Sequence, residues 1–385
     1  MPVIRLHIFP VLFLLLGSCV EPFEPRLEES QEVLVISGMI SDSPGPHTVS
    51  VSLSTPYRDP VYHPLPHCLV SVINQDGHMI HYLEEEEGIY LADIPDSFLE
   101  VGDAASVQVI TEWGEYRSDY DTILPCPVID SLYWDLDALQ TAEPGKEIPG
   151  VQFYLDMSGG ASDSRNIMWQ LEEAWEYTAS LFGNIIWRSP GTGFEDFRSN
   201  VLYRCWKQYL LGEFYVATTR HLSSNELSRF RLNFVSNETD RLSITYSLLI
   251  KQQSLTRESF DYWLRMRDQA LETGGLYEKQ PSSVQGNLYN MNNPEEVVLG
   301  NFYATQIREQ RIFIQNNNLF DFPVPQISCE YELLASLWQQ EHIEYPVYIY
   351  SPGPFQPSYT GPSYCFDCML QGGDTIRPEY WKSWE

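Results

Sequence analysis

Short stretches in which hydrophobic and polar residues alternate dominate the first third of the sequence. Val49 and Val51 alternate with small polar residues, which is the pattern of a β-strand with one buried face. The same alternation returns at residues 68–72, and Asp76-Gly77 follows as a hairpin turn. About seven such segments separated by turns predict an antiparallel β-sandwich over residues 31–127.

Two prolines around Cys126 end this pattern, because neither can donate a strand hydrogen bond and both disfavour helix. We therefore place a domain boundary there and predict a second β-rich domain over residues 128–350. Its expected strands cover residues 129–134, 151–157, 166–178, 242–250, 295–304 and 346–350. The predicted fold class is mostly β, with one or two short helices.

One segment, residues 257–272, has the period of an amphipathic helix. Thr256 is a typical N-cap, and Gly274-Gly275 would end the helix. The positions expected to share one face are Phe260, Trp263, Leu264, Arg267 and Leu271. A second, shorter helix is expected within residues 330–340. The proline- and tyrosine-rich residues 351–385 are expected to lie over the surface of the second domain.

Residues 166–178 contain several glutamates, yet the hydrophobic pattern favours a strand. The large apolar residues all fall on one parity, so Glu173 is the exception on a buried face. Aromatic faces can also bind sugars, and four tryptophans of the second domain are candidates for a ligand platform: Trp169, Trp175, Trp187 and Trp206. Packing in the core is the competing interpretation of each one.

The N-terminus carries Arg5, an apolar run over residues 8–16, and then Gly17-Ser18 before Cys19. This is a secretory signal over residues 1–18, too short for a membrane span, and its end is typical of a bacterial lipobox. An ordinary signal peptide is the alternative interpretation. With Cys19 acylated, the protein would be held on a membrane through lipid, and the acidic residues 19–30 would form a tether.

Charge and composition narrow the classes of function. The chain has 23 basic and 53 acidic side chains and a formal net charge of −30, which excludes nucleic acid as an expected partner because phosphate binding needs basic patches. Hydrophobic residues make up 43% of the chain and aromatic residues 14%, so it can bury a core and is not an acidic disordered tail.

The common catalytic and metal-binding motifs are absent from the sequence. It contains no G-x-S-x-G, no G-x-x-x-x-G-K-[ST] and no H-E-x-x-H. His63 and His67 flank a proline-containing loop without the spacing that aims two imidazoles at one ion. Glu172 and Glu173 are adjacent on a strand and should point to opposite faces. We therefore assign no catalytic residue, no cofactor and no metal site.

Seven cysteines occur, and reserving Cys19 for lipid leaves an even number in an exported chain. Four are disulfide candidates: Cys205, Cys329, Cys365 and Cys368. The C-terminal pair could close on itself or join the other two in longer bridges that tie the tail to the second domain. We favour a local Cys365–Cys368 bridge with Cys205–Cys329. Cys68 and Cys126 would then be free thiols or a third bond.

Five segments resemble, in order, the domain-of-unknown-function 4249 lipoproteins of the Bacteroidota. They are VLVISGMISDSPGPHTVSVSLSTPY (33–57), GIYLADI (88–94), VIDSLYW (128–134), TRESFDYWLRMRDQAL (256–271) and VVLGNFYATQ (297–306). The resemblance implies an outer-membrane lipoprotein whose first domain is similar to immunoglobulin-like or carboxypeptidase-regulatory-like modules. It also implies a TonB-dependent receptor as partner, and it brings no catalytic residues.

Together these observations lead to one expected function and two alternatives. We expect a lipid-anchored binding or accessory subunit of a TonB-dependent nutrient-uptake system at the outer membrane. The alternatives are an extracytoplasmic glycan or peptide hydrolase, and a surface adhesin or structural module. A broad exposed aromatic surface would favour binding, and a pocket lined by carboxylates with perturbed pKa values would favour hydrolysis.

Overall fold

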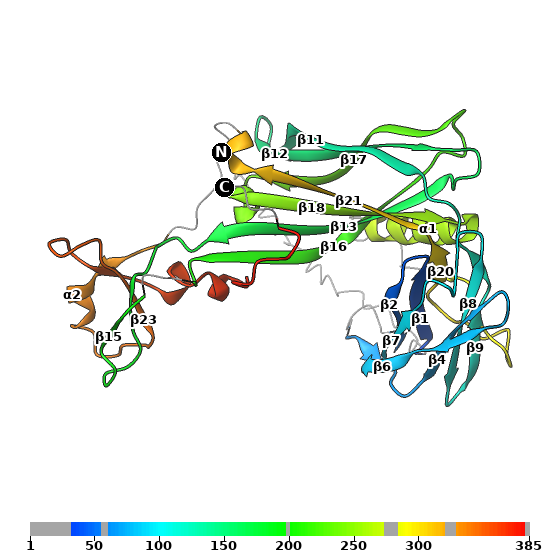
Figure 1. Ribbon diagram of the computed structural model, residues 1–385, viewed down its shortest axis with the longest axis horizontal. Coiled ribbons are helices and arrows are strands. Elements are labelled where there is room, and N and C mark those ends of the chain that lie inside the picture. The colour runs from blue at the N-terminus through cyan, green and yellow to red at the C-terminus, as the bar shows by residue number, and fades with distance from the viewer. Residues whose placement is uncertain (1–31, 55–60, 198–200, 273–283, 320–328, 382–385) are drawn as a thin grey trace, which may run out of the picture.

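The computed structural model describes residues 32–54, 61–197, 201–272, 284–319 and 329–381. The chain is mostly β, with 52% of it in strands and 10% in helices. The strands form several sheets, which confirms the predicted fold class. The molecule has three units (Figure 1). A first sandwich and a small distal unit, here called the head, lie at opposite ends of the long axis, and a second sandwich lies between them and overlaps the first along that axis.

The first sandwich consists of two six-stranded sheets. One sheet contains β1 (Leu34–Ser41), β2 (Gly45–Leu53), β3 (His63–Pro64), β6 (Leu83–Glu86), β7 (Ile89–Ile94) and β20 (Phe302–Thr305). The other contains β4 (Leu69–Asn74), β5 (Met79–His81), β8 (Ala104–Thr111), β9 (Gly114–Ser118), β10 (Asp121–Thr122) and β19 (Leu288–Asn290). Val49 and Val51 are fully buried between the sheets, as the alternation predicts.

The first sandwich is not continuous in sequence, which corrects the expected unit of residues 31–127. β20 runs parallel to β1, with Gly38 opposite Phe302, and β19 pairs with β9. Phe302 is fully buried in the sandwich core. Without β20 the long strand β1 would leave an open sheet edge and part of the core uncovered. Local alternation could not reveal this, because the two pairing segments lie far apart along the chain.

The second sandwich packs a three-stranded sheet on a four-stranded one, with a shared apolar core. The smaller sheet has the order β11 (Val128–Gln140), β12 (Glu147–Gly159), β17 (Asn225–Ser236). The larger has the order β16 (Arg204–Thr218), β13 (Asn166–Thr178), β18 (Thr245–Leu255), β21 (Ile307–Gln315). Residues 166–178 therefore form a strand as predicted, whereas β16, β17 and β21 were not among the expected strands.

Alternate residues of β13 point into the core of the second sandwich, as the sequence pattern predicts. Trp169, Leu171, Trp175 and Tyr177 all lie in the core of the second sandwich. Glu173 shares that face and is also buried, and it accepts a hydrogen bond from the Tyr246 hydroxyl at 2.9 Å. The Arg241 guanidinium lies 3.6 Å from its other oxygen. Burial raises the pKa of Glu173 above its usual range, and Arg241 and Tyr246 oppose that shift.

The helix α1 (Arg257–Glu272) covers the joint between the two sandwiches and matches the predicted bounds. The Thr256 hydroxyl accepts from the Ser259 amide at 3.4 Å, as an N-cap does, and donates to buried Asp121 of the first sandwich at 2.6 Å. Phe260 is buried at this joint, but Leu271 on the same predicted face is exposed. Gly274-Gly275 lies outside the described residues.

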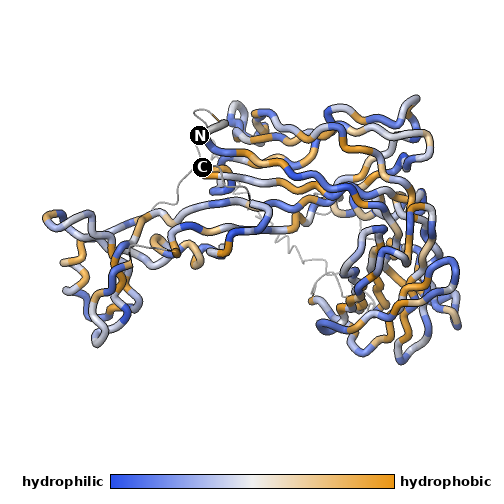
Figure 2. The backbone as a smooth tube through the Cα atoms, in the orientation of Figure 1, coloured by the Kyte–Doolittle hydropathy of each residue, from blue (hydrophilic) through white to orange (hydrophobic). Residues whose placement is uncertain are grey.

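The head is a five-stranded sheet in the order β15 (Phe194–Asp196), β14 (Ile185–Trp187), β23 (Val347–Tyr350), β24 (Tyr359–Thr360), β22 (Glu332–Leu333). It also contains α2 (Leu334–Leu337), within the range expected for a short helix. The expected domain of residues 128–350 is therefore divided, since parts of it build the head. Hydrophobic positions gather in the strands of the first sandwich and recur in the head (Figure 2).

The C-terminal tail does more than cover the second domain. Its first part contributes β24 to the head, and the 3₁₀ turns η3 (Ser363–Cys365) and η4 (Cys368–Gln371) follow. Beyond them Trp206 and Asp374 exchange backbone hydrogen bonds at 2.8 and 2.9 Å. Two further 3₁₀ turns, η1 (Asp240–Leu242) and η2 (Asn316–Leu319), flank β18 and β21. The tail therefore connects the head to the second sandwich.

Candidate binding surface

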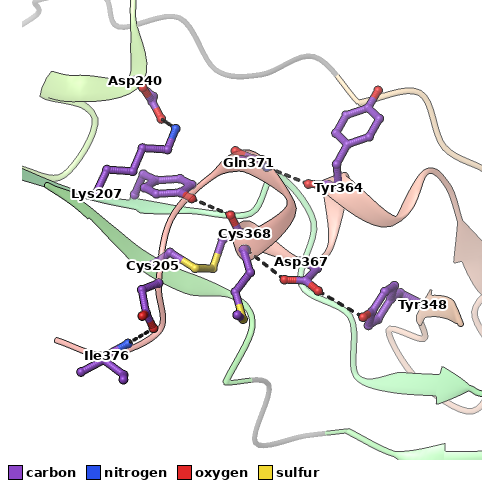
Figure 3. The surroundings of a disulfide bond; sticks show 12 residues. Cys205, Lys207, Asp240, Tyr348, Tyr364, Asp367, Cys368, Gln371 and Ile376 are labelled. Atoms are coloured by element: carbon purple, nitrogen blue, oxygen red, sulfur yellow. Dashed lines mark hydrogen bonds and ion pairs between the residues drawn. A yellow bond between two sulfur atoms is a disulfide. The ribbon is translucent and has the colours of Figure 1, made fainter. Parts of the chain in front are cut away.

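Two disulfides lie where the head meets the second sandwich, a region here called the neck. Cys205 bonds Cys368, with a Cα–Cα distance of 5.8 Å (Figure 3). Cys329 bonds Cys365, with a Cα–Cα distance of 5.9 Å. The favoured local Cys365–Cys368 bridge is therefore wrong, and the two longer bridges are present. The reason is that Cys365 packs in a cluster of the head, whereas Cys368 packs in the second-sandwich core. Cys68 and Cys126 are buried free thiols.

Hydrogen bonds reinforce the neck around η4. The Tyr177 hydroxyl donates to the Cys368 carbonyl at 2.5 Å. The Asp367 carboxylate accepts from the Met369 amide at 2.9 Å and from the Tyr348 hydroxyl at 3.3 Å (Figure 3). Burial, together with the Asp367 charge, raises the pKa of Tyr348 to about 12, so this hydroxyl remains a donor at neutral pH. These contacts and the Cys205–Cys368 disulfide link the head to β13 and β16.

The four candidate tryptophans do not form one platform. Trp169 is fully buried, and its indole Nε1 donates to the Gln252 side chain at 2.9 Å. Trp175 is buried opposite Lys207, and Trp206 lies on the neighbouring strand β16. Trp187 lies apart from them, in the head. The expected single surface is thus corrected, because strand pairing places Trp169 and Trp175 in the core.

An exposed aromatic cluster surrounds Trp187 and is here called the aromatic patch: Trp187, Phe194, Trp338 and Tyr345. Ring centroids of Trp187 lie 5.7 Å from Phe194, 4.6 Å from Trp338 and 4.9 Å from Tyr345. Phe194 is 54% exposed and Trp338 49% exposed, although Trp187 beneath them is buried. Such partly open rings offer a large apolar area at little cost in side-chain ordering.

The sequence did not reveal the partners of Trp187 in this patch. Phe194 follows it in a hairpin, but Trp338 and Tyr345 come from a segment far along the chain. No hydrophobic period connects these segments, since they meet only through the pairing of β14 with β23. Richness in tyrosine and proline near the C-terminus was the available signal, and it pointed to a surface segment without giving its partners.

A cavity of about 570 Å³ lies beside the aromatic patch and is here called the head groove. Leu337 and Val347 line it and also pack against Trp187, so groove and patch share a wall. Its polar lining includes Glu330, Glu332, His342 and Glu344, with Tyr331 among them. This size falls within the range of roughly 300 to 1,000 Å³ that is usual for ligand pockets.

A second cavity, of about 640 Å³, lies at the edge of the first sandwich near the start of the described chain. Trp113, Tyr116 and Glu296 contribute to its lining. The Tyr116 hydroxyl donates to Glu296 at 2.9 Å, and Asn290 donates to the other oxygen of that carboxylate at 2.7 Å. Because these polar groups are already partnered, the lining is better explained by structural needs than by a ligand.

The described residues contain no group of three or more His, Cys, Asp or Glu side chains placed to hold a metal ion. Glu172, the neighbour of buried Glu173, accepts from Gln208 at 2.7 Å and from Arg311 at 3.3 Å on the other face of β13. The two carboxylates therefore serve separate networks. Among these same parts of the chain, no helix is long and apolar enough to cross a membrane. Cys19, the candidate lipidation site, lies outside them.

One of three comparisons with known proteins, the match to a family profile, agrees with the resemblance noted in the sequence. No curated protein matches the chain. The crystal structure of trypsin activated alpha-2-macroglobulin from Escherichia coli is similar at 9% identity and a TM-score of 0.20, over 59% of this chain and 15% of that one. The sequence profile of the family described as "Domain of unknown function (DUF4249)" matches residues 20–311, which is more than half of the chain. The protein therefore belongs to the DUF4249 family.

Proposed function

We propose that the protein is a lipid-anchored binding subunit that uses the aromatic patch of its head to contact a partner. Anchoring would occur through Cys19 at the outer membrane, as the lipobox and the family resemblance imply. The partner that this resemblance implies is a TonB-dependent receptor. The proposal assigns the chain a binding role in nutrient uptake and no catalytic step.

The exposed aromatic patch carries this proposal. Aromatic side chains are enriched at protein interfaces, where they form the central contacts, and contiguous apolar exposure is unusual on a monomer. Phe194 and Trp338 are about half exposed although a small unit has few apolar side chains to spare for its surface. Their exposure therefore favours a partner that covers them.

The position of the patch also supports a binding role. The described chain enters the first sandwich at β1, and the head lies at the opposite end of the long axis (Figure 1). A chain anchored by its N-terminus would thus carry the patch away from its point of attachment. The disulfides and hydrogen bonds of the neck would keep the patch pre-organised, which lowers the entropy lost on binding.

Co-purification in mild detergent with the lipid intact tests the proposal. The double variant Phe194→Ala/Trp338→Ala removes the two exposed rings, and the sandwich variant Trp113→Ala/Tyr120→Ala removes two rings with similar exposures of 51% and 54%. We expect the receptor to co-purify with the wild type and the sandwich variant, and to be lost at least about tenfold with the patch variant. Equal recovery with both variants would contradict a role for the patch.

The anchor has its own test. Cys19→Ala should move the protein from the membrane fraction to the soluble fraction, because acyl chains contribute about 0.8 kcal/mol per buried methylene. Fractionation followed by a high-salt wash measures this directly. An adhesin would show a different pattern, with normal anchoring, no receptor in the purified complex and loss of surface attachment in the patch variant.

A further inference from the structure

The lining of the head groove comes from segments that a disulfide of the neck joins. Glu330 and Tyr331 follow Cys329, and Pro362 and Ser363 precede Cys365, so the Cys329–Cys365 disulfide joins two sides of the lining. Tyr331 also packs edge-on against Tyr359 of β24, with 5.4 Å between ring centroids, while 59% of it is exposed. The groove therefore presents the exposed ring of Tyr331 next to a disulfide that joins two parts of its lining.

The carboxylates of the groove contrast with three acidic side chains of the second sandwich that pair with arginine. These pairs are Arg229 with Asp135 at 2.7 Å, Arg231 with Asp137 at 3.2 Å and Arg311 with Glu172 at 3.3 Å. In the described part of the chain, no lysine or arginine forms an ion pair with Glu330, Glu332 or Glu344. Among the described residues, Glu332 accepts a neutral hydrogen bond from the Gln340 side chain at 2.8 Å. As far as the structure describes the chain, these three carboxylates of the groove therefore have no lysine or arginine counter-ion.

We propose that the head groove receives an extended, lysine- or arginine-bearing segment of the partner protein. Unpaired carboxylates favour a cation and disfavour an anion. The exposed ring of Tyr331 adds a face for a cation–π contact, and the adjacent aromatic patch would cover the apolar stems of the same side chains. The inference rests on the proposed function, since the groove and the patch would bind one partner.

Fluorescence anisotropy with defined peptides tests the charge preference. The probe is a labelled Gly-Ser peptide that carries alternating arginines, and the references replace arginine by glutamate or glutamine. The full-length mature protein in mild detergent should bind the arginine peptide in preference to both. Binding should weaken as salt increases, because the contacting charges are exposed and are screened. Equal binding of the glutamine peptide would overturn the proposal.

A matched pair of variants separates the groove from the overall negative charge. Glu330→Gln/Glu332→Gln/Glu344→Gln removes the charges of the groove, and Glu85→Gln/Glu86→Gln/Glu87→Gln removes the same number from exposed positions near β6. We expect the groove variant to bind the peptide roughly tenfold more weakly, because the binding free energies of three exposed charge pairs add up to about that factor. For the control variant we expect a change within about twofold. Equal weakening in both would show a general charge effect and overturn the proposal.

Partner co-purification distinguishes failure of this inference from failure of the proposed function. If the receptor remains with the groove variant but is lost with Phe194→Ala/Trp338→Ala, the head binds its partner without a cationic segment, and only this inference fails. If both variants retain the receptor, the proposed function fails as well. Loss of the receptor with both, together with loss of the arginine peptide in the groove variant alone, supports the inference. Displacement of the peptide by spermidine at equal charge concentration would instead indicate a small cation as the ligand and overturn the peptide assignment.

Discussion

The first sandwich and the head reach a stable fold by different means. The sandwich buries a continuous apolar core that draws side chains from both sheets, and its Cys68 is a free thiol. The described part of the head has two clusters of four buried side chains each, and the two disulfides lie at its base. A small unit buries a smaller fraction of its surface than a large one, so covalent cross-links replace part of the missing core.

Both units expose aromatic rings, but the exposed rings of the head, Phe194 and Trp338, belong to one cluster, with 6.2 Å between their centroids. In the sandwich, Tyr90 and Tyr116 are buried, and removing them would open the core. In the head, the cross-links restrict the unfolded chain, so Phe194 and Trp338 can remain at the surface. Phe194 and Trp338 therefore lie outside the buried clusters of the head, whereas Trp187, Leu337 and Val347 belong both to a buried cluster and to the patch or the groove.

The largest expected effect concerns the completeness of the sandwich. Residues 31–127 expressed alone should lack a cooperative thermal transition, because β19, β20 and the buried Phe302 are missing. Joining residues 284–306 to this fragment through a flexible linker should restore a cooperative transition in circular dichroism. A linked segment of scrambled sequence is the control, and cooperative melting of the short fragment alone would contradict the prediction.

Breaking the Cys205–Cys368 disulfide should affect the head and spare the sandwich. In Cys205→Ser/Cys368→Ser, the free energy of opening the head should fall by about 2–5 kcal/mol, because the bond closes a long loop. Hydrogen exchange should show lower protection in β14 and β23 and unchanged protection in β4 and β8. Cys68→Ala is the cysteine control in the sandwich. Equal loss of protection in both units would mean that they unfold together.

A smaller effect is expected from one hydrogen bond of the neck. Tyr177→Phe removes the donor to the Cys368 carbonyl and keeps the ring that Lys207 covers at 4.5 Å. The head should lose about 1–3 kcal/mol of stability, since a buried carbonyl is left without this partner. Hydrogen exchange in η4 measures the change. Tyr289→Phe, in β19 of the first sandwich, is a matched control for which no change in the head is expected.

The smallest effect is a pH dependence confined to the first sandwich. His47 Nε2 accepts from the Ser41 amide at 3.1 Å, and burial lowers the pKa of His47 below its usual 6.5. The unfolded chain therefore takes up the proton first, so this contribution to stability is complete above pH 6.5 and falls as pH drops toward the folded-state pKa. His47→Gln should reduce the slope of sandwich stability between about pH 5 and 6.5, and exposed His63→Gln should not.

Sequence reasoning succeeded where the signal was local. The parity of Trp169, Leu171 and Trp175 predicts the strand found at Asn166–Thr178, and the cap at Thr256 predicts the start of α1. It missed β16, an edge strand whose middle residues are exposed and so lack clear alternation. The formation of an edge strand depends more on packing against its one neighbouring strand than on its own pattern of hydrophobic residues.

The candidate surface depended on information that local patterns do not carry. Six cysteines allow fifteen pairings, and the choice was decided by Cys365 and Cys368 turning toward different clusters. Likewise, the aromatic patch needs Trp187 and Trp338 to meet across paired strands. Both features follow from tertiary contacts, so the sequence could supply the residue types but not their arrangement.

The parallel pairing of β1 with β20 also bears on the speed and order of folding. β1 begins at Leu34 and β20 at Phe302, so most of the chain is synthesised before this contact can form. Contacts between distant residues slow folding, because the intervening chain must first be brought together. The edge of β1 therefore stays open until β20 has been synthesised, and a chaperone that shields exposed strands would act on β1 during this interval.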